Sequence, residues 1–340
     1  MPALFPRTNL EQLRHQAKDL LATAKAGDEE ALARIRAVSS RLQLSSAQLA
    51  LAREYGFASW PRMKREVERR EILTSRDLGR LHRLLGEQPE LARIKMEHWR
   101  DHKQALPLGF MAMLRFDHER LALPDELPGT GAVAQALIDA GAPVDGDPGD
   151  KETPLITAAS YGDAEVARVL IDAGGDVNAV SAPDSGGVPG GSALLHAAVF
   201  GMTDVLDLLV AADAKVDSLE EAAAAGNIDG WLTPDATLQA RIRALVFAAD
   251  HQRLPVIDEL LDAGTPVDGF DEVWGRQALR IAAQNGRPAS VRRLLERGAD
   301  PNLRDKDGLT ALDWCRPGRR YLDGPGHAEV EAILQPLTTG

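Results

Sequence analysis

The stretch RPASVRRLLERGADPN (287–302) decides the fold of this 340-residue chain. Leu294 and Leu295 follow Val291 by three and four positions, so the three side chains form one apolar stripe of a short helix. Gly298 comes where such a helix would end in a left-handed residue, a conformation that glycine adopts without steric cost. The stretch therefore predicts a short amphipathic helix that ends in a tight polar turn.

The same pattern recurs four more times along the chain. The further copies are TGAVAQALIDAGAPVD (130–145), DAEVARVLIDAGGDVN (163–178), MTDVLDLLVAADAKVD (202–217) and RLPVIDELLDAGTPVD (253–268). Four of the five copies follow a second helical block with an alanine pair: ETPLITAASYG (152–162), GSALLHAAVFG (191–201), RALVFAADHQ (243–252) and RQALRIAAQNG (276–286). We expect these small side chains to let the helix approach the neighbouring repeat closely.

The spacing of the repeats is irregular. Gly162 and Gly201 are 39 residues apart because SAPDSGGVPGG (181–191) is inserted between them. Gly201 and Gly226 are only 25 residues apart, because the turn between repeats is missing there. A second insert is expected at residues 115–128. Because the stability of a repeat array is roughly a sum over repeats and their interfaces, we expect the junction at 218–240 to be its weakest point.

These paired blocks resemble the TPLHxAAxxG and LLxxGADxN blocks of the ankyrin-repeat family, whose repeats are about 33 residues long. The resemblance implies an all-α solenoid of about seven helix–turn–helix units over residues 72–340, some of them irregular. The signature histidine of the family is missing, and its positions hold Ile156, Leu195, Val246, Arg280 and Asp313. In the family that histidine ties neighbouring turns together, so we expect the geometry of these repeats to vary.

Residues 1–71 precede the repeats and are expected to form a small helical module. The string LEQLRHQAKDLLATA has apolar residues at helical spacing, which predicts one helix over 9–38 or two helices broken at Gly27 and Asp28. Such a module would cover the apolar face that the first repeat of a solenoid exposes.

The end of this module, LAREYGFASWPRMKREVE, resembles a segment found ahead of ankyrin arrays in bacterial proteins. Ser45 or Ser46 is expected to cap a helix here and Gly56 to end it. The aromatic residues of the segment are expected to form a small core; they are Tyr55, Phe57 and Trp60.

The charge and composition of the chain limit the classes of partner that it is expected to bind. The net charge of −12 repels nucleic acid and anionic membranes, so neither is expected as a partner. No apolar run reaches the roughly 18 residues that a membrane span needs. The single cysteine, Cys315, excludes an internal disulfide and indicates a reducing cytoplasm. Arginine and alanine are abundant and lysine is rare, which is typical of a bacterial source.

No pattern of catalytic residues emerges. His98 and His102 could share a helical face and hold a metal together with His118, but we expect this segment to be a polar turn between repeats. Cys315 is expected to be a buried structural thiol rather than a nucleophile. The chain has no GxSxG, phosphate-binding or dinucleotide-binding motif. We therefore assign no catalytic residue, metal or cofactor, and an enzyme is the less favoured class.

In ankyrin arrays, the concave groove is formed by the turn tips and by the two positions that follow the alanine pair. Carried over by register, the resemblance implies a partner-binding set made of Tyr161, Phe200, Asp250, His251, Trp274, Arg276, Gln284 and Asn285. Interfaces are enriched in tryptophan, tyrosine and arginine, which favours the aromatic members of this set.

Two functions follow from these observations. The favoured one is a cytoplasmic binding scaffold that recognises a protein partner in its concave groove. The alternative is an enzyme or small-ligand-binding protein of a bacterial biosynthetic pathway, with a pocket made by the two inserts and the irregular repeat at 218–240. A closed pocket that holds several of His98, His102, His118, Tyr161 and Asp250 would favour the alternative.

Overall fold

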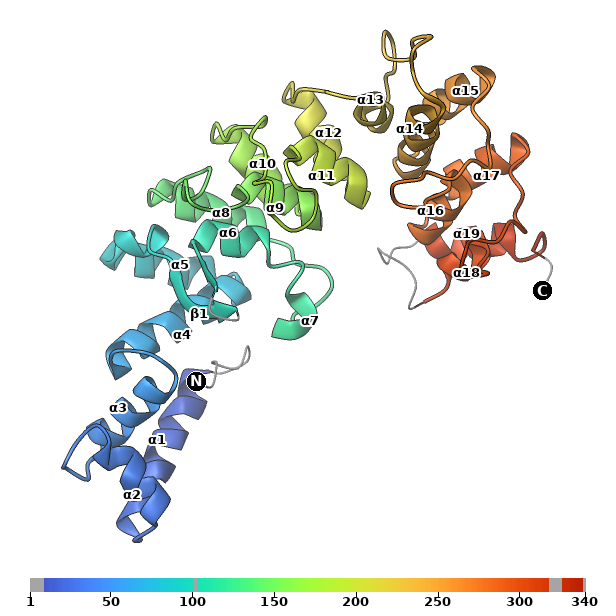
Figure 1. Cartoon of the computed structure of the whole chain (residues 1–340). Helices are drawn as coiled ribbons and strands as arrows, with labels where there is room; N and C mark the ends of the chain where they lie inside the picture. Colours follow the sequence, from blue (N-terminus) through green and yellow to red (C-terminus); the bar gives the residue numbers. More distant parts are fainter. Residues whose placement is uncertain (1–8, 101–102, 318–325, 339–340) are drawn as a thin grey trace. The chain divides into compact units, whose positions relative to one another are not determined.

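The computed structural model describes residues 9–100, 103–317 and 326–338. Within these residues the chain is built of helices and one two-stranded antiparallel sheet (Figure 1). It divides into two compact units, residues 1–175 and 176–340. In the described part of the chain, no helix is both long enough and apolar enough to span a membrane.

The first unit starts with four helices: α1 (Leu10–Lys25), α2 (Glu29–Arg36), α3 (Leu44–Glu54) and α4 (Trp60–Ser75). The expected break is confirmed, because Gly27 has a φ of 94° and Asp28 caps α2 by accepting the backbone N–H of Ala31 at 2.8 Å. The expected serine cap of α3 is wrong. Gln43 is the N-cap, while Ser45 and Ser46 lie in the first turn and the Ser46 hydroxyl bonds to Ser39 Oγ at 3.0 Å.

The aromatic residues of this module form a core, as expected. Phe57 is fully buried among Leu13, Ala52, Met63 and Val67, and Tyr55 and Trp60 pack against them. Gly56, with a φ of 84°, follows the end of α3 and lets the chain turn into α4.

A buried ion pair on α4 connects this module to the residues that follow it. Glu66 and Arg69 are 2.6 Å apart and both are buried. Arg69 Nη1 donates to the carbonyl oxygens of Leu91 and Ile94, each at 2.9 Å, and Glu66 accepts the backbone N–H of Glu97 at 3.0 Å. Burial raises the pKa of Glu66, so these hydrogen bonds and the guanidinium are what keep a charge at this depth.

The rest of the first unit contains α5 (Leu78–Glu87), the 3₁₀ turn η1 (Pro89–Ala92), β1 (Met96–Arg100), β2 (Lys103–Ala105), α6 (Pro107–Ala112), α7 (His118–Leu121), α8 (Thr130–Asp139), α9 (Pro154–Tyr161) and α10 (Ala164–Asp172). The inner helices α6 and α9 pack on each other, and the outer helices α5, α8 and α10 pack in a row. The polar turn expected around residues 97–102 is wrong, because β1 and β2 pair there as a hairpin. The short helix α7 lies in the expected insert at 115–128.

The second unit contains α11 (Ala193–Phe200), α12 (Thr203–Ala211), α13 (Leu219–Ala225), α14 (Leu238–Asp250), α15 (Leu254–Asp262), α16 (Ala278–Gln284), α17 (Pro288–Glu296), α18 (Ala311–Cys315) and α19 (Gly326–Leu334). The inner helices α13, α14, α16 and α18 pack in succession, as do the outer helices α15, α17 and α19. α13 has no outer helix of its own, because residues 226–237 are turns. This is the shortened repeat that the 25-residue interval indicates.

Local sequence explains these helix pairs. The alanine pairs of α9, α11, α14 and α16 are fully buried, as expected for inner helices that approach each other closely. The glycines after the outer helices adopt positive φ, from 80° at Gly264 to 91° at Gly141. Thr153 caps α9 and Pro154 occupies its first turn, where its missing N–H costs no hydrogen bond. The insert at 181–191 is closed by a bridge between Val180 and Ser192.

Candidate functional site

The carboxyl end of α11 is held by three side chains from distant parts of the second unit. His251 Nε2 lies 3.0 Å from the carbonyl oxygen of Ala198, and Arg276 Nη1 donates to the carbonyl of Val199 at 2.9 Å. Arg287 Nη2 donates to the carbonyl of Gly201 at 2.6 Å. The last carbonyls of a helix have no partner within it and carry partial negative charge, so guanidinium groups stabilise this end.

Three residues of the expected partner-binding set lie inside this contact. Asp250, His251 and Asn285 are only 1%, 2% and 6% exposed. Asn285 Nδ2 donates to Asp250 Oδ1 at 2.7 Å, and Thr203 Oγ1 lies 2.9 Å from His251 Nδ1. Burial lowers the pKa of His251. Their polar groups bind the chain itself, because the end of α11 lies against them.

Trp274 forms the exposed part of the site. It belongs to the finger, which we define as residues 270–277, closed by a bridge between Phe270 and Gln277. Asp271 is buried, and its carboxylate accepts the backbone N–H groups of Val273 at 3.1 Å and Trp274 at 2.7 Å. A short aspartate turn therefore fixes the backbone that presents the indole.

The Trp274 ring is supported by two neighbours and still faces solvent. It stacks on Phe247 of α14, with ring centroids 5.9 Å apart and an interplanar angle of 21°. The guanidinium carbon of Arg276 lies 5.4 Å from the ring centroid, within reach of a cation–π interaction. Trp274 remains 42% exposed, Val273 is 62% exposed and Phe270 is 36% exposed. The finger thus displays an apolar surface whose tryptophan is packed on one side and exposed on the other.

A second arginine–tryptophan pair lies in the following repeat. The guanidinium carbon of Arg280 is 5.2 Å from the Trp314 ring centroid, and Arg280 Nη1 is 3.3 Å from Asp305. Trp314 Nε1 donates to the same carboxylate at 2.8 Å. Burial lowers the pKa of Arg280, while Asp305 opposes this effect. In the sequence, Arg280 is notable only because it occupies the position of the family's signature histidine. The pair with Trp314 is not indicated there, since the pair depends on a contact between repeats.

The other expected residues are dispersed. Phe200 is half-buried at the end of α11, with its ring centroid 6.1 Å from that of His196. Gln284 is half-buried, and its backbone carbonyl oxygen lies 2.9 Å from His327 Nε2. Tyr161 belongs to the first unit, where its ring centroid lies 4.7 Å from that of Phe116. Within the expected set, Trp274 and Arg276 therefore lie in contact, with Trp274 exposed and Arg276 half-buried.

The helical arrangement expected for a metal site at His98 and His102 is not found in the described part of the chain. Because Met96–Arg100 is a strand, the helical spacing of His98 and His102 does not apply, and His102 lies outside the described residues. His118 Nδ1 lies 2.7 Å from the Arg115 carbonyl. Among the described residues, no group of His, Cys, Asp and Glu side chains could hold a metal ion. Cys315 is fully buried and its thiol donates to the His327 carbonyl at 3.5 Å, as expected of a structural thiol.

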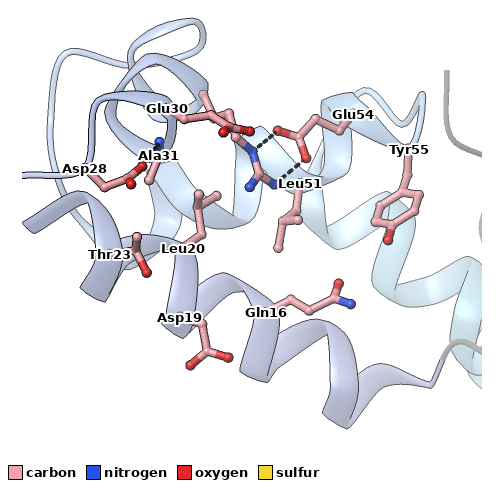
Figure 2. A pocket seen from close by; sticks show the side chains of 11 residues that line it. Gln16, Asp19, Leu20, Thr23, Asp28, Glu30, Ala31, Leu51, Glu54 and Tyr55 are labelled. Atoms are coloured by element: carbon pink, nitrogen blue, oxygen red, sulfur yellow. Dashed lines mark hydrogen bonds and ion pairs between the residues drawn. The ribbon is translucent and has the colours of Figure 1, made fainter.

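A cleft of about 520 Å³ lies elsewhere, between α1, α2 and α3 of the first unit (Figure 2). Neither insert lines it. Its walls carry Gln16, Asp19, Leu20, Thr23, Asp28, Glu30, Ala31, Arg34, Leu51, Glu54 and Tyr55.

Comparisons with known proteins identify the repeats. Residues 129–220 match the family described as ankyrin repeats (3 copies), and residues 260–315 match ankyrin repeats (many copies). The ankyrin repeat and SAM domain-containing protein 6 of Danio rerio is 34% identical over 144 residues, which are 39% of this chain and 20% of that protein. The E3 ubiquitin-protein ligase Ufd4 of Drosophila melanogaster is 37% identical over 119 residues, which are 35% of this chain and 4% of that protein.

Among solved structures, the human ASB11 ankyrin repeat domain aligns with 69% of this chain and 98% of its own length, at 21% identity and a TM-score of 0.32. The chain spans a fifth or less of the two curated relatives named above. The matched segments contain three of the four buried alanine pairs and the glycine-ended outer helices described above. These two segments of the chain, residues 129–220 and 260–315, are therefore similar to ankyrin repeats.

Proposed function

We propose that this protein is a binding scaffold that recognises a protein partner through the finger and the adjoining inner helices α16 and α18. Ankyrin repeats serve as protein-interaction modules, and arrays of repeats present extended surfaces suited to that role. The proposal keeps Trp274 and Arg276 from the expected set and adds Arg280 and Trp314. It leaves out the buried Asp250, His251 and Asn285.

The observation that carries the proposal is the fixed but exposed ring of Trp274. The ring is 42% exposed, although Phe247 and Arg276 both contact it. A side chain that is already immobilised loses little conformational entropy when a partner covers it. Tryptophan and arginine are also the residues most often found at the energetic centre of interfaces. The finger is therefore preorganised for an apolar contact.

The next repeat extends this surface with a polar contact. Arg280, Asp305 and Trp314 are held together by an ion pair, a hydrogen bond and a cation–π contact. Asp305 also fixes the backbone of its own turn, because its carboxylate accepts hydrogen bonds from the backbone N–H groups of Asp307 and Leu309. The apolar finger is thus followed by a fixed arginine–tryptophan pair, in which the Arg280 side chain is 13% exposed.

We further infer that the protein works in the cytoplasm of a bacterium. Support comes from the single, buried cysteine and from the predominance of arginine over lysine. A small molecule remains a further candidate ligand, whereas the negative net charge argues against nucleic acid and anionic membranes.

The test is to capture partners from the source cell with the full chain and with a double variant of the finger, Trp274→Ala with Val273→Ala. The variant should lose the captured protein while its melting temperature stays within about 5 °C of the wild type. Val210→Ala is the control, since Val210 is 37% exposed on the outer helix α12 and should leave capture unchanged. Capture by the double variant at the wild-type level would overturn the assignment of this surface.

A photo-crosslinking side chain locates the contact directly. Introduced at Val273, which is 62% exposed, it should form a covalent adduct with the captured partner. The same side chain at Val210 should not. Crosslinking from Val210 alone would place the partner on the outer helices and contradict the proposal.

A further inference from the structure

The cleft of the first unit has an apolar floor. Leu20 of α1, Ala31 of α2 and Leu51 of α3 line it, and they are 6%, 4% and 4% exposed. Figure 2 shows Leu20 and Leu51 directed into the space between the helices. Such a floor suits a long charged side chain. The methylene groups of such a side chain lie along apolar surface, while its charged end stays in polar surroundings.

The rim of the cleft is acidic. Asp19, Asp28, Glu30 and Glu54 line it together with one cation, Arg34. Glu54 and Arg34 neutralise each other, because Arg34 Nε and Nη2 each donate to the Glu54 carboxylate at 2.8 Å. Asp28 caps α2, while Asp19 and Glu30 are exposed and join no ion pair within the described part of the chain. The cleft therefore carries an excess of negative charge next to its apolar floor.

Two further groups point to a ligand that donates hydrogen bonds. Gln16 Oε1 is buried and accepts no hydrogen bond from the described residues, and Figure 2 shows its amide directed into the cleft. A buried acceptor without a donor costs free energy unless a bound group supplies one. Tyr55 adds a half-buried ring at the end of the cleft, and its accessible part is a surface on which a planar cation can stack.

We propose that this cleft binds an arginine side chain of a basic protein segment. Its methylene groups would lie on Leu20 and Leu51, the negative charge of Asp19 and Glu30 on the rim would attract its guanidinium, and the guanidinium would donate to Gln16 Oε1. Arginine fits better than lysine because its planar group donates several hydrogen bonds at once and stacks on aromatic rings. This site is separate from the finger, so the proposal does not depend on the function proposed above.

The experiment uses the full chain labelled with 3-fluorotyrosine and the peptide (Gly-Ser-Arg)₄ as the probe. The sequence has three tyrosines, so the ¹⁹F spectrum is simple, and Tyr55→Phe assigns the signal of Tyr55. The peptide should shift that signal in a saturable manner and leave the other two in place. The acidic peptide (Gly-Ser-Glu)₄ should have no effect.

Two variants with the same change of charge distinguish a site from general attraction. Asp19→Asn with Glu30→Gln should weaken binding about tenfold, since each removed contact of a partly exposed ion pair has a modest effect. Asp229→Asn with Asp235→Asn changes two exposed carboxylates of the second unit and should leave binding within about twofold.

Three outcomes would overturn the proposal. The first is the absence of a saturable shift of the Tyr55 signal, and the second is equal weakening in both double variants. The third is binding of spermine as tight as that of the peptide. Spermine carries charge without a guanidinium, so that result would assign the cleft to polyamines rather than to a protein segment.

Discussion

Arg276 and Val199 are 77 positions apart in the sequence, and Arg276 Nη1 donates a 2.9 Å hydrogen bond to the Val199 carbonyl. The same guanidinium lies over the ring of Trp274. One side chain therefore connects the end of an inner helix to the exposed surface of the finger.

Replacing this side chain should destabilise the second unit. Arg276→Met removes a charged donor from a helix end, and we expect the free energy of unfolding to fall by about 2 kcal/mol. Urea denaturation measures the change. Arg292→Met is the control, because Arg292 and its partner Glu329 are each about half exposed, and its effect should stay below about 0.5 kcal/mol. Equal losses in both variants would show that the Val199 contact adds no stability.

Alanine substitutions at Gly201 and Gly264 distinguish the destabilisation caused by backbone strain from that caused by steric crowding. Both have positive φ, 72° and 80°, so alanine at either position costs about 1–2 kcal/mol. A Cβ at Gly201 would also lie 3.0 Å from Asp250 Oδ2 and Asn285 Nδ2, whereas a Cβ at Gly264 meets nothing within 4 Å. We expect Gly201→Ala to be more destabilising than Gly264→Ala by about 1 kcal/mol or more, as measured by chemical denaturation. Similar losses would mean that the Asp250–Asn285 pair moves aside freely.

Acidification should weaken the second unit through His251. Burial lowers the pKa of His251 in the folded chain, while an unfolded imidazole titrates near its ordinary value of about 6.5. As pH falls below that value, the unfolded chain takes up the proton first, so the free energy of unfolding decreases until the folded pKa is reached. His251→Gln should show a smaller decrease between pH 7.5 and 5.5 in urea titrations. Residues that titrate in both proteins contribute equally and cancel when the wild type is compared with the variant. An identical dependence of the free energy of unfolding on pH in the two proteins would contradict this role of His251.

Hydrogen exchange should find the weak point after α13 rather than within it. Ala222, Ala223 and Ala224 of α13 are at most 1% exposed and the helix packs on α14, so its amides should be protected. Residues 229–237 form turns with mostly exposed side chains and should exchange much faster than α14 and α15. Protection of 229–237 equal to that of α14 would show that the missing outer helix has no local effect.

Sequence patterns predict the repeated part of the fold well because it depends on local rules. Apolar spacing, alanine pairs and helix-ending glycines act within one or two turns, and the helices lie where these signals place them. The hairpin of β1 and β2 was missed, since its polar residues lack the apolar alternation of a half-buried strand.

The candidate site was predictable only in part. Trp274 was indicated because a turn tip is exposed in any regular repeat, and it is 42% exposed. Asp250 and His251 were expected at the surface because the register places them there. The shortened repeat of α13 lets the end of α11 contact them. The register of the repeats alone does not predict that contact.

The bonds from His251, Arg276 and Arg287 to α11 have a consequence for how the protein can be divided. Solenoids are usually shortened repeat by repeat, because each repeat contacts only its neighbours. Here a chain cut between α13 and α14 would lose the donors of the Ala198, Val199 and Gly201 carbonyls. We therefore expect the repeats from α11 to α16 to unfold together, and fragments intended to fold independently should keep all of them.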